Sequence, residues 1–191
     1  PSRPEESDET RIVTARLAGN GYVVIAADYI GKGDSAEPDS YMVREATVQA
    51  CVDMLFAARA VLADLGIAED GLFLSGWSQG SWSTQQFRHR LESLNVPVKA
   101  AATAATPNDL YLLLTRWINN PTALDATWLA GSVILFTHSY AHYYDMPGLP
   151  QTVIKPEYEA ACRDFYANKT GWEQLQPQIP GKIADLVQKD V

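Results

Sequence analysis

The sequence predicts an α/β fold with a mostly parallel sheet, flanking helices and a helical block in the second half of the chain. Two observations carry this prediction. Up to about residue 108, apolar runs of strand length alternate with amphipathic segments of helix length, which is typical of parallel sheets. From residue 109 to residue 191 the patterns are helical, and only residues 133–137 could form a strand.

The first elements follow from end signals and apolar spacing. Ser7 or Asp8 can cap a helix that runs to about Ala18 and is stopped by residues 19–21, which read G-N-G. A continuous apolar, β-branched run at residues 22–27 predicts a strand that is buried on both faces. The buried stripe of the helix would consist of Ile12, Ala15, Leu17 and Ala18.

The later elements alternate in the same way. A Gly-, Asp- and Pro-rich loop leads to a long helix that Gly66 ends, and then to a strand, a helix and a second strand. These five segments are residues 28–40, residues 42–65, residues 72–75, a helix to about residue 94, and residues 98–106. The second part holds helical segments at residues 109–119, 122–144 (one helix or two), 156–168 and 180–189, with a Pro/Gly loop at residues 146–156.

Composition fits one globular domain and argues against some partners. The chain has 191 residues, of which 47% are hydrophobic and 20% charged, enough for a sizeable core. The formal net charge of -8, from 23 acidic and 15 basic residues, argues against a nucleic-acid partner, because phosphate binding needs a basic face. No uninterrupted apolar stretch has the length of a membrane span, so no transmembrane segment is expected.

Two cysteines, Cys51 and Cys162, could form one disulfide. Cys51 lies in a predicted amphipathic helix, which favours a buried free thiol, while the pairing of the two and the redox compartment stay open. The first seven residues, a predicted loop, begin P-S-R-P and contain neither an initiator Met nor a signal peptide. The chain therefore reads as the middle of a longer polypeptide.

Residues 76–80, called the elbow below, read G-W-S-Q-G and join a predicted strand to a predicted helix. A Ser at such a turn adopts a backbone conformation that non-Gly residues avoid, and it stands above the first amides of the helix. A Cβ at Gly76 or Gly80 would clash with adjacent backbone. Ser78 is therefore the candidate nucleophile, and the N–H of Gln79 is the candidate oxyanion donor. The alternative is a tight turn in which Ser78 only caps the helix.

Residues 26–35 read A-A-D-Y-I-G-K-G-D-S after the preceding strand, and together with the elbow they resemble the α/β-hydrolase superfamily. They look most like its secretory-lipase-like serine esterases, whose fourth strand ends in a D-Y-x-G-x-G-x-S loop. Gly31, Gly33 and Ser35 match that loop. The resemblance covers about residues 21–109 and, more loosely, the helical block as the lid of the family.

The resemblance implies a serine hydrolase that cleaves carboxylic esters, small-molecule or lipid, through an acyl-enzyme on Ser78. A His would take the proton of Ser78, and the N–H of Gln79 with one further N–H would hold the oxyanion. Trp77 would shape the acyl pocket, with packing on the sheet as its alternative role. No cofactor and no metal is expected. The acidic balance and the resemblance suggest a secreted or periplasmic protein.

The chain departs from the family in what it contains. In this fold the triad runs in the order Ser, acid, His, on loops after later strands. Neither those strands nor the first three strands are visible in the sequence. We therefore expect residues 1–108 to be the central part of an α/β-hydrolase core and residues 109–191 to be its helical cap. The missing strands would lie outside this chain, for instance on a second fragment.

Five other residues could serve the site. His89 lies about three turns along the helix that follows the elbow and points away, so a solvated or packed His is expected. His138 and His142 would share one helix face, but without a third ligand they predict no metal site. Asp109 follows the third visible strand, where it could be the triad acid, although an N-cap is favoured. Asp28 is expected to fix the loop that follows it through backbone hydrogen bonds.

Two other functions stay open. A peptidase or another acyl transferase could use the same fold and the same nucleophile. A non-catalytic binding protein could keep the turn as structure. However, the strained Ser costs about 1–3 kcal/mol, and binding alone would not require it.

Overall fold

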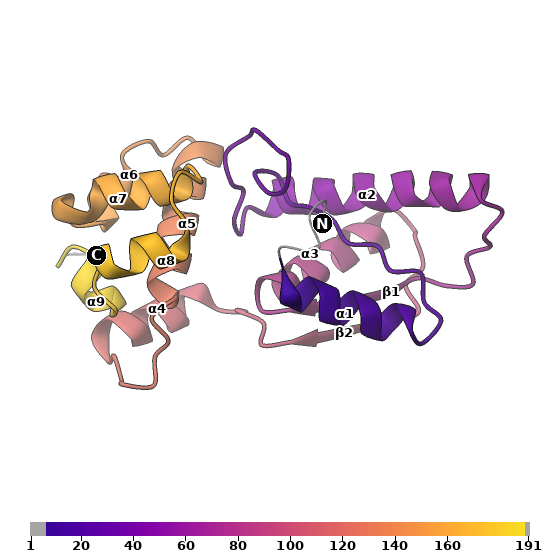
Figure 1. Cartoon of the computed structure of the whole chain (residues 1–191), viewed down its shortest axis with the longest axis horizontal. Helices are drawn as coiled ribbons and strands as arrows, with labels where there is room; N and C mark the ends of the chain where they lie inside the picture. Colours follow the sequence, from indigo (N-terminus) through magenta and orange to yellow (C-terminus); the bar gives the residue numbers. More distant parts are fainter. Residues whose placement is uncertain (1–6, 190–191) are drawn as a thin grey trace. The chain divides into compact units, whose positions relative to one another are not determined.

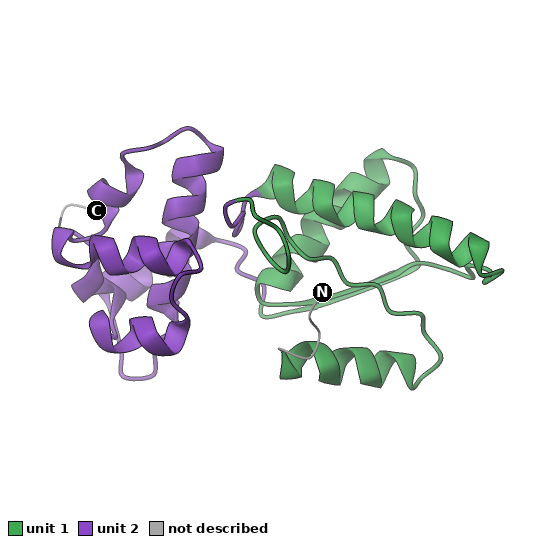
Figure 2. Cartoon of the chain, turned by 45° about the horizontal axis from the view of Figure 1, so that its top comes forward, with its two compact units in different colours: residues 1–37, 44–105 green, residues 38–43, 106–191 purple. Residues whose placement is uncertain are grey.

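The structure, a computed structural model, describes residues 7–189, so most of the loop expected at residues 1–7 lies outside the described residues. The chain divides into two compact units, each with its own hydrophobic core (Figure 2). Unit 1 comprises residues 1–37 and 44–105, and unit 2 comprises residues 38–43 and 106–191.

Unit 1 is built around a parallel pair of strands joined by a helix (Figure 1). Strand β1 (Phe73–Trp77) leads into helix α3 (Gln79–Ser93), and strand β2 (Ala100–Ala104) pairs with β1 so that Phe73 lies opposite Ala100. Helices α1 (Asp8–Ala18) and α2 (Arg44–Asp64) complete the unit. Its core is formed by buried side chains of α2, α3 and β1: Cys51, Val52, Leu55, Leu74, Phe87 and Leu91.

The helix ends of unit 1 confirm two of the sequence signals. Ser7 caps α1, because its hydroxyl accepts the N–H of Thr10 at 3.2 Å. Gly66 follows α2 with a φ of +67°, and the N–H of Ile67 donates to the carbonyl of Leu62 at 2.8 Å. Both signals are local in the chain, so they act regardless of what else the helix contacts.

Residues 22–27 are not a strand in the structure, and that prediction is wrong. The segment does pass close to the sheet, since the ring of Tyr22 meets the ring of Phe73 edge-on at 5.8 Å. A strand exists only where its backbone pairs with a neighbour, and within the described residues β1 pairs with β2 alone. The burial expected on both faces is also absent, since Tyr22 is 49% and Val23 57% exposed.

The buried stripe expected on α1 is also wrong, because α1 buries none of its residues. Ile12 is 66% exposed, and Ala15 and Ala18 are exposed as well. An amphipathic pattern predicts which face a helix would bury, but burial requires a surface to cover. The described part of the chain offers a sheet of only two strands for that purpose.

Helix α2 is the one helix among residues 7–189 that is long and apolar enough to cross a membrane. The sequence patterns did not predict this. Its buried residues Cys51, Val52 and Leu55 pack into the core of unit 1. Core helices that cover a sheet meet the same measure of length and composition, so we base no membrane assignment on α2.

Unit 2 consists of short helices around a core of its own. The longest, α5 (Leu129–Tyr143), carries more buried residues than any other described helix of the unit. Its core side chains come from α5 and from the segments after it: Ala130, Ile134, Ile154, Cys162, Leu175 and Leu186. The other helices are α4 (Leu110–Asn119), α6 (Leu149–Val153), α7 (Pro156–Tyr166), α8 (Trp172–Leu175), the 3-10 helix η2 (Gln176–Gln178) and α9 (Ile183–Leu186).

Two expectations for unit 2 are corrected by the structure. Residues 133–137 lie inside α5 and form no strand. This segment is a short apolar run, and the periodicity of such a run cannot by itself distinguish a buried strand from a buried helix segment. The Pro/Gly-rich stretch at residues 146–156 contains α6, whose second residue is Pro150, a position where Pro is tolerated.

Residues 38–43, called the strap below, belong to unit 2 although they interrupt unit 1 in the sequence. Hydroxyl groups of unit 2 hold their backbone carbonyls. Tyr143 donates to the carbonyl of Pro38 at 2.7 Å, and Tyr166 donates to that of Asp39 at 2.9 Å. The hydroxyl of Ser139 donates to the carbonyl of residue 41 at 2.8 Å. The strap therefore packs as part of the helical unit.

Both cysteines are free and buried, which confirms the expectation for Cys51. Burial raises the pKa of Cys51 to about 11 and that of Cys162 to about 12, the latter with a contribution from the charge of Glu159. We expect neither thiol to react with a disulfide reagent at mildly alkaline pH in the folded chain. Both should react in concentrated urea, and rapid reaction of either in the native state would contradict this.

Candidate active site

The elbow joins β1 to α3 through Ser78, whose φ of +50° and ψ of −116° are rare for a residue with a side chain. This is the strained turn that the sequence predicts. The N–H of Ser78 donates to the carbonyl of Ala104 in β2 at 3.0 Å, so the turn begins as a continuation of the sheet. The carbonyl of Ser78 accepts the N–H groups of Ser81 and Trp82 at 3.0 and 3.2 Å, so the turn ends as the first bonds of the helix.

The side chain of Ser78 makes no capping hydrogen bond to α3 and is partly exposed. An N-cap residue has an extended backbone and a side-chain oxygen that accepts from the first turn, and Ser78 has neither feature. The structure therefore argues against the capping alternative. Gln79 is the first residue of α3, so its N–H has no acceptor within the helix and points toward the positive end of the helix dipole.

The two glycines of the elbow differ in what they permit. A Cβ built on Gly76 would lie 2.1 Å from the carbonyl oxygen of Gly80 and 2.5 Å from Oγ1 of Thr84, so the clash predicted there is confirmed. A Cβ built on Gly80 would meet nothing within 4 Å in the described part of the chain, so the clash predicted there is wrong. The close approach is one-sided, because Gly80 presents its carbonyl to Gly76.

The loop that follows residues 22–27 has the geometry that its glycines suggest. Gly31 and Gly33 have φ values of +85° and +62°. The hydroxyl of Ser35 accepts the N–H of Gly31 at 3.2 Å and so closes the loop. Tyr29 is hydrogen-bonded to Ser83 of α3, and burial raises the pKa of its phenol. The loop is thereby attached to the helix that carries the elbow.

The other residues proposed for the site lie as follows. Trp77, the residue before Ser78, is 63% exposed, and its role in an acyl pocket or in packing on the sheet stays a prediction. His89 is exposed, with its ring 3.8 Å from the carboxylate of Glu92, so of the two expected roles it is solvated and not packed. Asp109 caps α4 by accepting the N–H of Leu112 at 2.8 Å, which confirms the favoured N-cap. The loop-fixing role of Asp28 stays a prediction.

His138 and His142 both lie on α5, and no group of three or more metal-ligating side chains exists among residues 7–189. His138 is buried, places Nδ1 at 3.0 Å from the carbonyl of Ile134, and stacks on Tyr166 at 5.1 Å. Burial lowers its pKa below the ordinary value of 6.5. The pattern of two His four residues apart therefore reflects one packed side chain and one near the surface.

A pH dependence of stability follows from His138. Because its pKa is depressed in the folded chain, the unfolded chain takes up the proton first as the pH falls below 6.5. We expect the free energy of unfolding of the protein to fall between pH 7 and pH 5, and to fall less in His138→Phe, which can still stack on Tyr166. Chemical denaturation at several pH values measures this. The matched control is His89→Gln at an exposed position, and equal slopes in both variants would refute the assignment.

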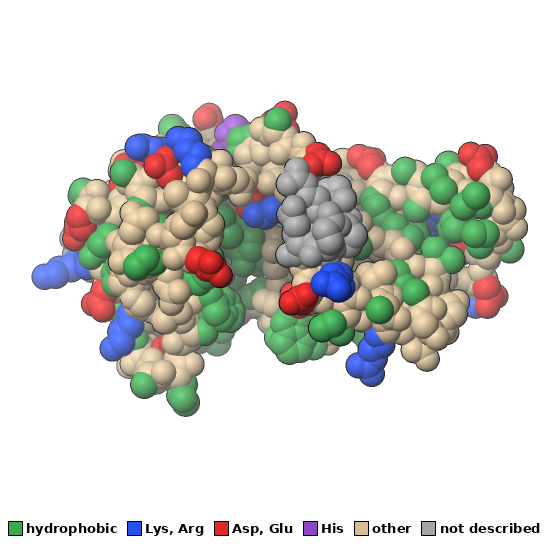
Figure 3. Space-filling model, viewed as in Figure 1, with side chains coloured by type: hydrophobic (Ala, Val, Ile, Leu, Met, Phe, Trp, Pro, Cys, Tyr) green, Lys and Arg blue, Asp and Glu red, His purple; other side chains and the backbone are tan. Residues whose placement is uncertain are grey.

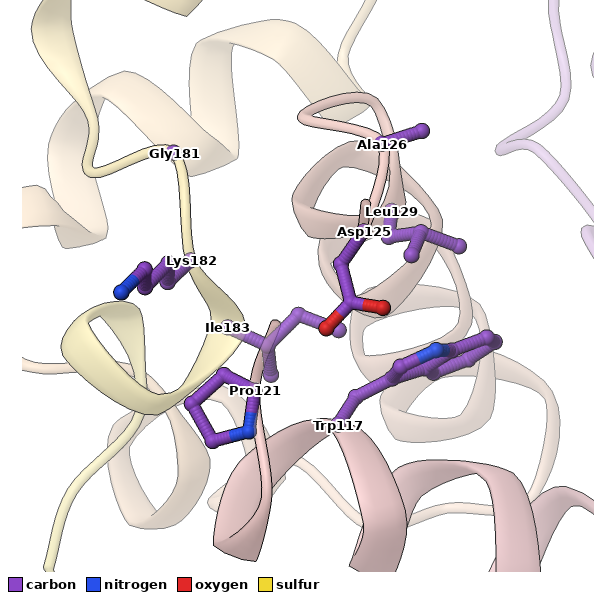
Figure 4. Close-up of a pocket in the computed structure, with 8 residues that line it drawn as sticks. All are labelled: Trp117, Pro121, Asp125, Ala126, Leu129, Gly181, Lys182 and Ile183. Atoms are coloured by element: carbon purple, nitrogen blue, oxygen red, sulfur yellow. The ribbon is translucent and has the colours of Figure 1, made fainter. Parts of the chain in front are cut away.

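Unit 2 holds a small pocket whose lining includes Trp117, Pro121, Leu129, Ile183, Asp125 and Lys182 (Figure 4). Asp125 is already engaged, because Arg116 donates to its carboxylate and lowers its pKa. The pocket therefore offers apolar walls rather than reactive groups, and we assign it no role.

Charged side chains of both signs are interspersed on the face of the molecule shown in Figure 3. No continuous basic surface is visible on this face, in keeping with the net charge of -8.

No family model and no curated protein matches the chain. Solved structures do match over nearly all of it. A protein of Legionella pneumophila subsp. pneumophila assigned as a hydrolase has a TM-score of 0.85 and 23% identity, over 96% of this chain and 50% of that one. The rice cell wall degrading esterase LipA from Xanthomonas oryzae has a TM-score of 0.75 and 25% identity, over 98% and 51%. A ligand-bound form of LipA has a TM-score of 0.72 and 23% identity, over 98% and 51%.

These similarities define the class of fold. The chain has a partial α/β fold of the kind found in a hydrolase and an esterase, and it spans about half the length of the solved structures that it matches. The resemblance seen in the sequence is supported at the level of the fold, while the roles of Ser78, Gln79 and Trp77 stay predictions.

Proposed function

We propose that this chain carries the nucleophile of a serine hydrolase that cleaves carboxylic esters. The observation that supports it most is the backbone of Ser78, held at a φ of +50° between a parallel strand and a helix N-terminus. Strain of this kind persists where the surroundings impose it, and it is concentrated at functional sites. The similarity in fold to a hydrolase and to the esterase LipA supports the same reaction class.

In the proposed reaction, Oγ of Ser78 attacks the acyl carbonyl carbon while a His accepts the hydroxyl proton. The tetrahedral oxyanion is stabilised by the N–H of Gln79 and the positive end of the α3 dipole. The His then protonates the departing alcohol, and water cleaves the acyl-enzyme by the same steps. His89, the only His in unit 1, is exposed and paired with Glu92, so we do not assign it as the base.

Further assignments rest on the same proposal. Residues 109–191 would act as a helical cap over the substrate, which would be a small-molecule or lipid ester. Trp77, exposed beside the nucleophile, would contact the acyl group. A secreted or periplasmic location fits a hydrolase of this type.

The test is a fluorophosphonate serine probe with intact mass spectrometry, applied to the chain and to a longer polypeptide that contains it. We expect a single adduct per chain, located on Ser78 by peptide mapping. A panel of esters and the matching amides then separates an esterase from a peptidase. Absence of an adduct from both polypeptides, or an adduct on another serine, would refute the proposal.

A further inference from the structure

Thr84, in the second turn of α3, connects the helix back to the strand that precedes the elbow. Its Oγ1 donates to the carbonyl of Ser75 in β1 at 3.1 Å, across nine positions of sequence. The side chain is buried, with 8% of its surface exposed. The bond is partly buried and joins the strand before the turn to the helix after it, so it constrains where α3 can lie relative to β1.

Thr84 also adds to the crowding beside the first glycine of the elbow, which the carbonyl of Gly80 already approaches more closely. A Cβ at Gly76 would lie 2.5 Å from Oγ1 of Thr84, so the hydroxyl occupies the space beside Gly76. The glycine and the threonine are therefore matched, because the absent side chain leaves room for the hydroxyl to reach the carbonyl of Ser75.

Hydrogen bonds to both peptide groups of Ser78 hold its strained backbone. The N–H of Ser78 is held by the carbonyl of Ala104, and its carbonyl is held by amides of the first turn of α3. These bonds fix the peptide groups of Ser78 itself. The bond from Thr84 to Ser75 ties the strand before the turn to the helix after it. A strained conformation persists only when its surroundings over-determine it in this way.

We propose that Thr84 is a positioning residue for Ser78, acting through the Ser75 carbonyl to hold the nucleophile at the turn. Its consequence for reactivity rests on the proposed function, whereas its consequence for the backbone does not. The neighbouring Ser83 is not part of this proposal. Its hydroxyl donates to the carbonyl of Gln79 at 2.9 Å, four residues back, a bond that helices commonly form.

The first test measures the backbone directly. Amide hydrogen exchange of Ser78, followed by NMR, should be about tenfold faster in Thr84→Val, which keeps the shape of the side chain and removes the donor. Thr84→Ser keeps the hydroxyl and should restore the wild-type rate. If Thr84→Val does not fold, Thr84→Ala takes its place in the same comparison.

Thr47→Val is the matched control. Thr47 is fully buried in α2 of the same unit, and its hydroxyl has no hydrogen-bond partner among the described residues. The same substitution there should leave the exchange of Ser78 unchanged. Equal exchange rates in Thr84→Val and Thr47→Val would overturn the proposal.

The second test measures reactivity. At a temperature where all variants are folded, labelling of Ser78 by the fluorophosphonate should be about tenfold slower in Thr84→Val and normal in Thr84→Ser and Thr47→Val. Labelling of Thr84→Val at the wild-type rate would overturn the role of Thr84 in positioning the nucleophile. If the wild type is labelled neither in this chain nor in the longer polypeptide that contains it, the proposed function fails, and the exchange of the Ser78 amide alone decides whether Thr84 holds the turn.

Discussion

Replacing Ser78 with alanine should lower ester turnover by about 10⁴-fold or more and remove the fluorophosphonate adduct, because no other group can form the acyl-enzyme. The fold should survive. The Ser78 side chain makes no capping bond and is partly exposed, so we expect the free energy of unfolding to change by about 0.5 kcal/mol or less. Intact mass after probe treatment, hydrolysis of a chromogenic ester and chemical denaturation measure the three quantities.

The matched control for this prediction is Ser93→Ala. Ser93 is the last residue of α3, and its hydroxyl donates to the carbonyl of Arg90 at 2.7 Å on the exposed side of the helix. Labelling and turnover should be those of the wild type. If Ser78→Ala still acquired one adduct or hydrolysed the ester at the wild-type rate, the nucleophile would be another residue.

What the sequence predicted well is what short stretches of chain determine by themselves. Ser7 and Asp109 cap helices because an N-cap needs only a side-chain oxygen that accepts the unpaired backbone N–H three residues later. Gly66 ends α2 because a positive φ is easy only for glycine. Ser78 lies at a strained turn because the elbow motif encodes strand, turn and helix within five residues.

What the sequence could not predict depends on partners far away in the chain. Among the described residues the apolar run at residues 22–27 pairs with no strand, and α1, which was expected to bury one face, buries no residue. Residues 133–137 lie in a helix that the sequence pattern did not identify. Because α5 is buried on several sides, its pattern lacks the polar face by which a helix is recognised. Pairing and burial are properties of the whole assembly of elements.

Within the candidate site, the missed residue is Thr84. It lies four residues after Gly80, so the two share one face of α3, the face that looks back toward the strand. A polar, β-branched residue at that position of an otherwise buried helix face was the available signal. The sequence did not reveal its partner, because the carbonyl of Ser75 becomes available only once the turn is formed.

Replacing Gly76 with alanine should destabilise unit 1 by about 3 kcal/mol, the upper end for overpacking, whereas Gly80→Ala should be neutral or stabilising. At Gly76 the new Cβ would lie 2.1 Å from the carbonyl oxygen of Gly80, which is backbone and cannot rotate away. At Gly80 the new Cβ would meet nothing within 4 Å in the described chain, and alanine favours the helix by about 0.5–1 kcal/mol. Urea denaturation of both variants measures the difference.

Adding Thr84→Ala to Gly76→Ala separates the two clashes. The double variant removes the contact with Oγ1 of Thr84 at 2.5 Å but keeps the contact with the carbonyl of Gly80. We therefore expect no recovery of the free energy of unfolding. Full recovery would mean that Thr84, and not the backbone of the helix, is what demands a glycine at position 76. Equal destabilisation by Gly76→Ala and Gly80→Ala would mean instead that Gly80 is also enclosed in solution. The one-sided packing of the elbow would then be wrong.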